Sequence, residues 1–130
     1  MLNERNWGKW ENVFSEKERQ TFKKLREQYE KLTREERFQV KLADDMESDE
    51  EALIRYKRFI TRIAKEYAGK KILLVSHGNI LKILLVHLGF GNWQELPSGS
   101  ITNTGYVVFY TNGEDFIIKE THGIIKNLRN

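Results

Sequence analysis

His77 is the residue whose type and surroundings most suggest chemistry, because it separates two apolar runs in the stretch ILLVSHGNILKILLV. The run Lys71–Ser76 shows no alternation, which is typical of a strand covered on both faces. The run Ile80–Leu88 is rich in leucine and is followed by a glycine, which favours a helix. His77 would then stand where a strand ends and the free N–H groups of a helix attract an anion. There an imidazole can bind a phosphate oxygen or relay a proton; a histidine bonded to a backbone carbonyl is an equally good interpretation.

The other two histidines are weaker candidates for chemistry. His87 lies inside the predicted helix and belongs to no strand end, which indicates a structural role. His122 follows a predicted strand in the stretch ETHGII, but few residues remain after it to hold a site. We therefore expect neither of them to be catalytic.

Helices are predicted on the N-terminal side of His77 by repeated capping boxes, in which a serine or threonine precedes a glutamate by three positions. The helix opened by Ser48 and Glu51 has the clearest apolar stripe, from Leu53 to Tyr67, and is expected to end near Gly69. Trp7 and Trp10 are expected to anchor the N-terminal segment to the core. The capping pairs are Ser15 with Glu18, Thr33 with Glu36, and Ser48 with Glu51.

A β-hairpin is predicted near the C-terminus. The aromatic and β-branched stretches Gly105–Thr111 and Asp115–Thr121 flank Asn112 and Gly113, two residue types that tolerate positive φ in a turn. The order of elements is therefore helix, helix, strand, helix and hairpin. This order indicates an α/β domain with a mixed sheet.

Composition limits the kind of protein this chain can be. Its 130 residues suffice for one compact domain, and 39% hydrophobic with 32% charged residues is typical of a folded chain. The sequence has no cysteine, so it offers neither disulfides nor thiolate metal ligands, and we expect no metal or other cofactor. The apolar stretches are short for a membrane span, and the start MLNERNWGKWEN does not resemble a signal peptide. We expect a cytoplasmic protein without a membrane partner.

The net charge of +3 and the pI of about 9.1 raise the possibility of a nucleic-acid partner. However, basic and acidic residues are interleaved throughout Glu16–Glu36, which is typical of a solvated helix face. Nucleic-acid binding is therefore the weakest of the hypotheses, and it predicts a salt-sensitive affinity for DNA or RNA.

Four segments in order resemble the histidine phosphatase superfamily, whose fold is that of the phosphoglycerate mutases. LVSHGNILKILL resembles the family's second-histidine motif, and MESDEEALIR its Glu-Ser segment with a following arginine. LNERNWGKWE resembles the segment of the proton-donating glutamate, and SITNTGYVVFY the strand after the second histidine. The resemblance covers nearly the whole chain. It implies a three-layer α/β fold with a mixed, mostly parallel sheet flanked by helices.

The resemblance implies a two-step phosphoryl transfer on a small phosphoester. In the family a nucleophilic histidine takes the phosphoryl group and passes it to water or to a second hydroxyl. By position, His77 would be the second histidine, which binds the group during transfer, and Glu4 the acid that protonates the leaving oxygen. Arg5, Gly78 and Asn79 match positions that contact substrate in mutase-type members. Phosphatase and mutase members share these motifs, so the resemblance leaves the choice between them open.

The family's Arg-His-Gly strand, which carries the nucleophile, has no counterpart in this sequence. We therefore expect a single domain over residues 1–130 that lacks the N-terminal part of the family fold. That strand neighbours the strand that ends in His77, so Ile72–Val75 would have an unpaired apolar edge. Three situations stay open: a truncated chain, association with a second copy or a separate N-terminal piece, or an edge rebuilt in another way.

Two functions follow from these observations. The first is a histidine-phosphatase-type enzyme whose isolated chain has negligible activity, because no histidine stands in an Arg-His-Gly context. The alternative is a non-catalytic module of the same fold that binds phosphate or another protein. In both cases the expected small-molecule partner is a phosphorylated substrate or phosphate.

Overall fold

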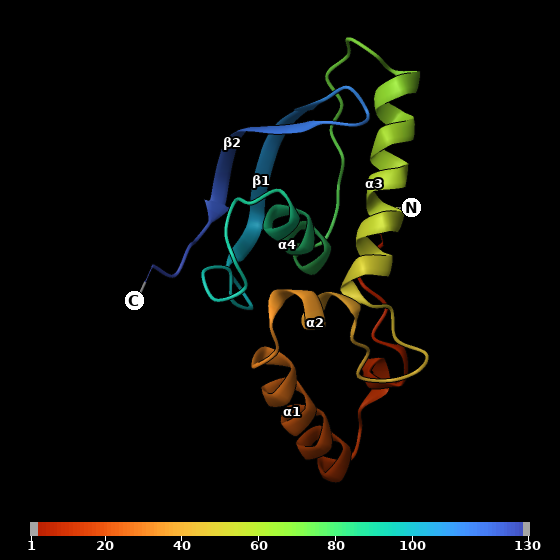
Figure 1. Ribbon diagram of the computed structural model, residues 1–130, viewed down its shortest axis with the longest axis vertical. Helices are drawn as coiled ribbons and strands as arrows, with labels where there is room; N and C mark the ends of the chain where they lie inside the picture. Colours follow the sequence, from red (N-terminus) through yellow and green to blue (C-terminus); the bar gives the residue numbers. More distant parts are fainter. Residues whose placement is uncertain (1–2, 129–130) are drawn as a thin grey trace. The chain divides into compact units, whose positions relative to one another are not determined.

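The computed structural model describes residues 3–128 and divides them into two compact units. The N-terminal unit is Arg5–Ala52, and the C-terminal unit comprises residues 3–4 and 53–128. Among the described residues, no helix combines the length and the apolar character needed to cross a membrane. Along the chain (Figure 1) the elements are η1 (Gly8–Asn12), α1 (Glu16–Glu30), α2 (Arg34–Gln39), α3 (Asp49–Glu66), α4 (Gly78–His87), β1 (Ile101–Thr111) and β2 (Phe116–Ile124).

The three predicted capping boxes are confirmed. At α1 the Ser15 side chain accepts a bond from the backbone N–H of Glu18, and the Glu18 carboxylate bonds back to Ser15. Thr33 and Glu36 do the same at α2. At the start of α3 the two bonds between Ser48 and Glu51 are 2.9 and 3.1 Å long. These side chains satisfy N–H groups that would otherwise lack partners at each helix start.

In the N-terminal unit, aromatic side chains hold η1 against α1. The Trp10 ring stacks on Phe22 with centroids 5.2 Å apart, and Trp7 meets the same ring edge-on at 6.0 Å. The indole N–H of Trp10 donates to the carbonyl oxygen of Leu42 at 3.0 Å. The expectation that both tryptophans anchor the N-terminal segment is confirmed.

In the C-terminal unit, α4 supplies half of the buried apolar residues. Its side chains are buried on several sides, and α4 packs against β1. The helix interpretation of this run is confirmed. The helix ends at His87, and Gly89 beyond it has a φ of +76°, which allows a Schellman-type closure. The α3 residue Thr61 ties the hairpin turn to the same unit by donating to the carbonyl oxygen of Gly113 at 2.7 Å. The buried apolar residues of this unit are Leu53, Tyr56, Ile60, Ile80, Ile83, Leu84, Leu85, Val86, Trp93 and Leu96.

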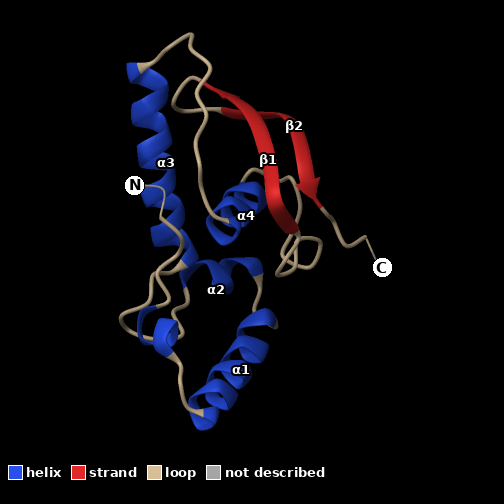
Figure 2. Ribbon diagram, turned by 180° about the vertical axis from the view of Figure 1, so that it is seen from behind, coloured by secondary structure: helices blue, strands red, loops and turns tan. Residues whose placement is uncertain are grey.

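The predicted hairpin is confirmed, and β1 begins earlier than expected. β1 and β2 pair antiparallel with Tyr106 opposite His122 and Thr111 opposite Phe116 (Figure 2). The turn between them is closed by Asn112, whose side-chain oxygen accepts from two following backbone N–H groups at 2.8 Å. Side chains alternate between the two faces of a strand, and in β1 the face that carries Tyr106 is exposed whereas the opposite face is half-buried.

The predicted strand over Lys71–Ser76 is not formed within the described residues. The segment is extended in Figure 1, but only β1 and β2 are hydrogen-bonded as strands. A strand needs a neighbour for its backbone groups, and the hairpin pairs with itself instead. The α/β class is thus observed, whereas the expected mostly parallel mixed sheet is not confirmed: the sheet of residues 3–128 has two antiparallel strands.

Candidate functional site

His77 is the residue at which α4 begins. Its backbone is extended, with φ −125° and ψ 156°, and its carbonyl oxygen accepts the first intrahelical bond, from Leu81 at 3.1 Å. Its own side chain makes no capping bond to the helix, and the residue is exposed. The imidazole is therefore available to a ligand at the N-terminus of α4, where the helix dipole favours negative charge.

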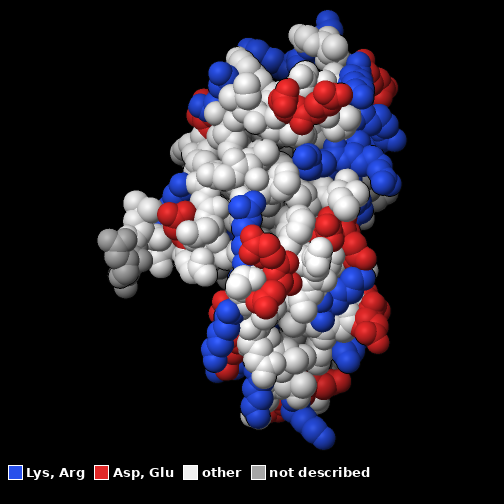
Figure 3. Space-filling model, viewed as in Figure 1, with Lys and Arg blue, Asp and Glu red and all other residues white. Residues whose placement is uncertain are grey.

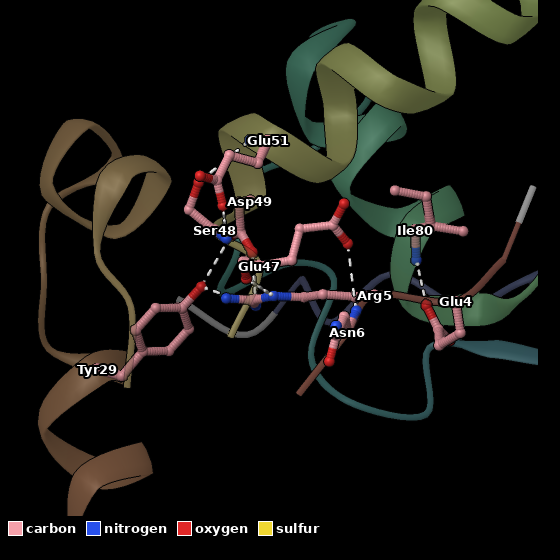
Figure 4. A network of polar contacts seen from close by, with 9 residues as sticks. All are labelled: Glu4, Arg5, Asn6, Tyr29, Glu47, Ser48, Asp49, Glu51 and Ile80. Atoms are coloured by element: carbon pink, nitrogen blue, oxygen red, sulfur yellow. Dashed lines mark hydrogen bonds and ion pairs between the residues drawn. The ribbon is translucent and has the colours of Figure 1, made fainter. Parts of the chain in front are cut away.

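The Glu4 carboxylate occupies the N–H groups at this helix start. One oxygen accepts from the backbone N–H of Asn79 at 3.2 Å. The other accepts from the backbone N–H of Ile80 at 3.0 Å (Figure 4). A carboxylate at a helix N-terminus is stabilised both by these bonds and by the dipole. The structure thus brings together Glu4, Asn79 and the helix start that follows His77, although Glu4 lies far from the others in the sequence.

Arg55 of α3 holds the segment that carries Glu4. Its two terminal guanidinium nitrogens donate to the carbonyl oxygens of Asn3 at 3.2 Å and Glu4 at 3.4 Å. These bonds hold the backbone that carries Glu4. Arg55 is the arginine that follows the Glu-Ser segment MESDEEALIR, and its bonds to Asn3 and Glu4 became visible only through the fold.

Arg5 lies next to Glu4 in the chain but belongs to the N-terminal unit, where its side chain is 5% exposed. One terminal nitrogen pairs with the Asp49 carboxylate at 2.5 Å and donates to the Tyr29 hydroxyl at 3.2 Å (Figure 4). The Nε atom donates to the carbonyl oxygen of Glu47 at 3.0 Å. This guanidinium is engaged inside its own unit, and its predicted contact with substrate stays a prediction.

Tyr29 completes the polar cluster of the N-terminal unit. Its hydroxyl donates to the second oxygen of Asp49 at 2.8 Å, and its ring lies 5.6 Å from the Arg5 guanidinium carbon. Burial raises the pKa of the Tyr29 hydroxyl, and the negative charge of Asp49 raises it further. The phenol therefore stays neutral and serves as a donor.

A family model described as the histidine phosphatase superfamily (branch 1) matches residues 1–122. The chain belongs to the histidine phosphatase superfamily. Comparisons with curated proteins and with solved structures found no match. Superfamily membership supports phosphatase-type or mutase-type chemistry in general.

Gly78 and Asn79 form the first turn of α4 in this histidine phosphatase superfamily member. A methyl group added at Gly78 would meet only the Ile101 side chain, at 4.0 Å, so packing inside the chain does not require a glycine. The close approach of a ligand to the Gly78 backbone therefore stays a prediction. The Asn79 backbone serves the Glu4 carboxylate, and its predicted contact with substrate also stays a prediction.

The two other histidines have partners away from the helix start. His122 lies in β2, where its ring stacks on the ring of Tyr106 with centroids 5.3 Å apart. His87 is the last residue of α4, at the opposite end from His77, and its Nε2 lies 3.5 Å from the Lys57 ammonium. Among residues 3–128, no group of three or more histidine, aspartate or glutamate side chains is placed to hold a metal ion.

The first half of β1 contains a strained residue that our sequence analysis did not single out. Thr104 is the one non-glycine residue among the described residues with positive φ, at 65°, and it sits in an irregularity of the β1–β2 register. Residues other than glycine rarely adopt a positive φ, and residues in such strained backbone conformations recur at functional sites. The only signal in the sequence was the run Asn-Thr-Gly.

Proposed function

We propose that this chain binds the phosphoryl group of a small phosphomonoester at the N-terminus of α4, for histidine-phosphatase-type transfer. The observation that carries the proposal is the Glu4 carboxylate, which accepts hydrogen bonds from two backbone N–H groups directly after His77. An anion is already favoured at this position, and a phosphoryl oxygen is an acceptor of the same kind. Superfamily membership supports the chemistry.

In this proposal His77 and Glu4 have different roles. The His77 imidazole donates to an oxygen of the phosphoryl group, while the N–H groups of Asn79 and Ile80 exchange the carboxylate for a second oxygen. The negative charge of a bound phosphoryl group favours the protonated form of the displaced Glu4 carboxyl group. That group can then protonate the leaving oxygen. Catalysis of this transfer consists mainly of positioning and charge stabilisation, which such donors provide.

The covalent step needs a nucleophilic histidine, and no histidine of this sequence follows an arginine in an Arg-His-Gly motif. We therefore propose that the 130-residue chain alone binds phosphate without turnover. The three-layer fold with a mostly parallel sheet belongs to the same proposal, since it needs a strand beside Lys71–Ser76. A histidine on that strand would lie near His77, because parallel strands end at the same edge of a sheet.

Titration with inorganic phosphate tests the binding step. We expect the wild-type chain to bind, and His77→Ala to weaken binding about tenfold or more, because it removes a charge-assisted hydrogen bond. His122→Ala is the matched control and should bind like the wild type. Equal binding by all three proteins, or no binding by any, would contradict the proposed site.

Incubation with an aryl phosphate tests the second part. We expect no turnover above background by the wild-type chain. Turnover that disappears in His77→Ala would instead show that this chain supplies its own nucleophile.

A further inference from the structure

The segment Lys71–Ser76 leaves both its backbone and its side chains available. Its N–H and C=O groups make no backbone hydrogen bond to any described residue. The side chains of Leu73 and Val75 are 88% and 83% exposed, whereas Leu74 between them is half-buried. An extended segment with unpaired backbone groups and apolar side chains is a template for a further strand. Within it, Ile72–Val75 carries neither the charge nor the proline that usually protects such edges.

A second copy of the same segment matches this edge. In an antiparallel pair related by a twofold axis at Leu74, Leu73 of one copy lies opposite Val75 of the other, and the reverse. The two most exposed apolar side chains then cover each other. Moving the axis to Leu73 would place the Lys71 ammonium against Val75, so the pairing at Leu74 suits the side chains better.

The charges at the two ends of the segment also complement each other in this arrangement. The segment begins with Lys70 and Lys71, both exposed, and ends beside the Glu4 carboxylate at the start of α4. Antiparallel pairing sets the basic end of one copy along the acidic end of the other. Charge complementarity favours this register and orientation over alternatives.

We propose that two copies pair antiparallel along Lys71–Ser76 and that Lys71 of each copy completes the phosphoryl site of the other. In the register centred on Leu74, Lys71 lies directly opposite His77, and opposite residues project on the same face. An ammonium group then stands beside the imidazole, where both can donate to a phosphoryl oxygen. This proposal rests on the proposed function, since it names the partner that contributes to the same site.

On the face drawn in Figure 3, side chains of both charges are present, and basic side chains gather at the upper right, over α3. The proposed pairing instead supplies a cation at one defined position, beside His77.

Disulfide trapping tests the register, because the chain contains no cysteine of its own. Leu73→Cys and Val75→Cys are prepared separately, mixed and oxidised mildly. We expect a covalent dimer to form faster in the mixture than in either protein alone, since only the mixture places the two thiols opposite each other. Leu128→Cys, at a position that is 71% exposed, is the control for random collision. Equal rates for all samples, or an uncross-linked monomer, would overturn the pairing.

Sedimentation of the full chain tests the surface independently. We expect a dimer whose dissociation constant rises at least tenfold in Leu73→Lys and hardly changes in Leu128→Lys. Because Leu73 is exposed, its replacement should not prevent folding. A monomeric wild-type chain overturns the inference, as does a dimer that is insensitive to Leu73→Lys. Pairing only with a separately supplied strand carrying an Arg-His-Gly motif would also overturn it.

Phosphate binding by mixed variants tests whether the site is shared. Lys71→Ala and His77→Ala should each bind phosphate weakly. A one-to-one mixture should regain about a quarter of the wild-type sites, because about half of the dimers hold one complete site. Phosphate binding that ignores Lys71→Ala overturns the shared site and leaves the proposed function intact. A wild-type dimer, identified by sedimentation, that binds no phosphate overturns the proposed function and the shared site together.

Discussion

Glu4 and Arg5 are neighbours in the chain, but their side chains belong to two contrasting regions. Arg5 joins a closed polar cluster in the N-terminal unit, in which Asp49 is 1% exposed and Tyr29 5%. Glu4 in the C-terminal unit caps a helix start next to the exposed residue His77. Both are held by charge-assisted hydrogen bonds, but those of Arg5 are buried, whereas those of Glu4 lie beside an exposed histidine. Burial therefore separates a structural cluster from a candidate site.

The largest effect is expected from Asp49→Ala in the closed cluster. The substitution leaves the buried Arg5 guanidinium without its carboxylate, which costs about 3–5 kcal/mol of unfolding free energy. Urea denaturation measures this loss. Lys41→Ala is the control: it breaks the Lys41–Glu51 pair, at 2.8 Å but largely exposed, and should cost less than about 1 kcal/mol. If both variants lose the same stability, burial does not distinguish the two pairs.

Tyr29→Phe should have the next largest effect. It removes the hydroxyl that donates to Asp49 and accepts from Arg5, so two buried charged groups each lose a partner. We expect a loss of about 1–3 kcal/mol in the same denaturation experiment. Removal of the hydroxyl from Tyr110, which is 64% exposed, gives the matched control, and Tyr110→Phe should be nearly neutral. A neutral Tyr29→Phe would mean that the cluster tolerates an open position.

Glu4→Gln should lower the stability by less than Tyr29→Phe does, and it should strengthen the binding of phosphate. The amide loses the negative charge that the start of α4 favours, which costs about 1 kcal/mol. It also competes less well with phosphate for the N–H groups of Asn79 and Ile80. We expect phosphate to bind more tightly to Glu4→Gln than to the wild type, measured by titration. Weaker binding in this variant would show that the carboxylate does not occupy the phosphate position.

Local signals in the sequence predicted the parts of the fold that depend on neighbouring residues. The capping pairs, the apolar stripe of α3 and the Asn112 turn each involve residues a few positions apart, and each is present in the structure. The anion-attracting helix start after His77 was predictable for the same reason. The bonds of Glu4 to that helix start join residues 75 and 76 positions apart, and only the family resemblance pointed to Glu4.

The parts that sequence patterns did not predict depend on what lies beside them. The apolar run Lys71–Ser76 has the composition of a buried strand, but composition does not supply a neighbouring strand. The run is accordingly extended and exposed at Leu73 and Val75. Likewise, the resemblance matched Arg5 to a position that contacts substrate, but its burial with Asp49 follows from packing that no short motif specifies.

The smallest predicted effect concerns Glu51, an exposed counterpart of the buried carboxylate at Asp49. The hydrogen bond from Lys41 lowers the pKa of Glu51 below its ordinary value of 4.5, and the bond from the Ser48 backbone lowers it further. A carboxyl group with a lowered pKa in the folded state stabilises the protein above pH 4.5, and this contribution is lost as the pH falls through the folded-state value. Glu51→Gln should therefore cost about 0.5–1 kcal/mol at pH 7 and less in acid, as followed by urea denaturation at both pH values. A difference between wild type and Glu51→Gln that stays constant into acid would mean that the capping geometry, rather than the charge, provides the stabilisation.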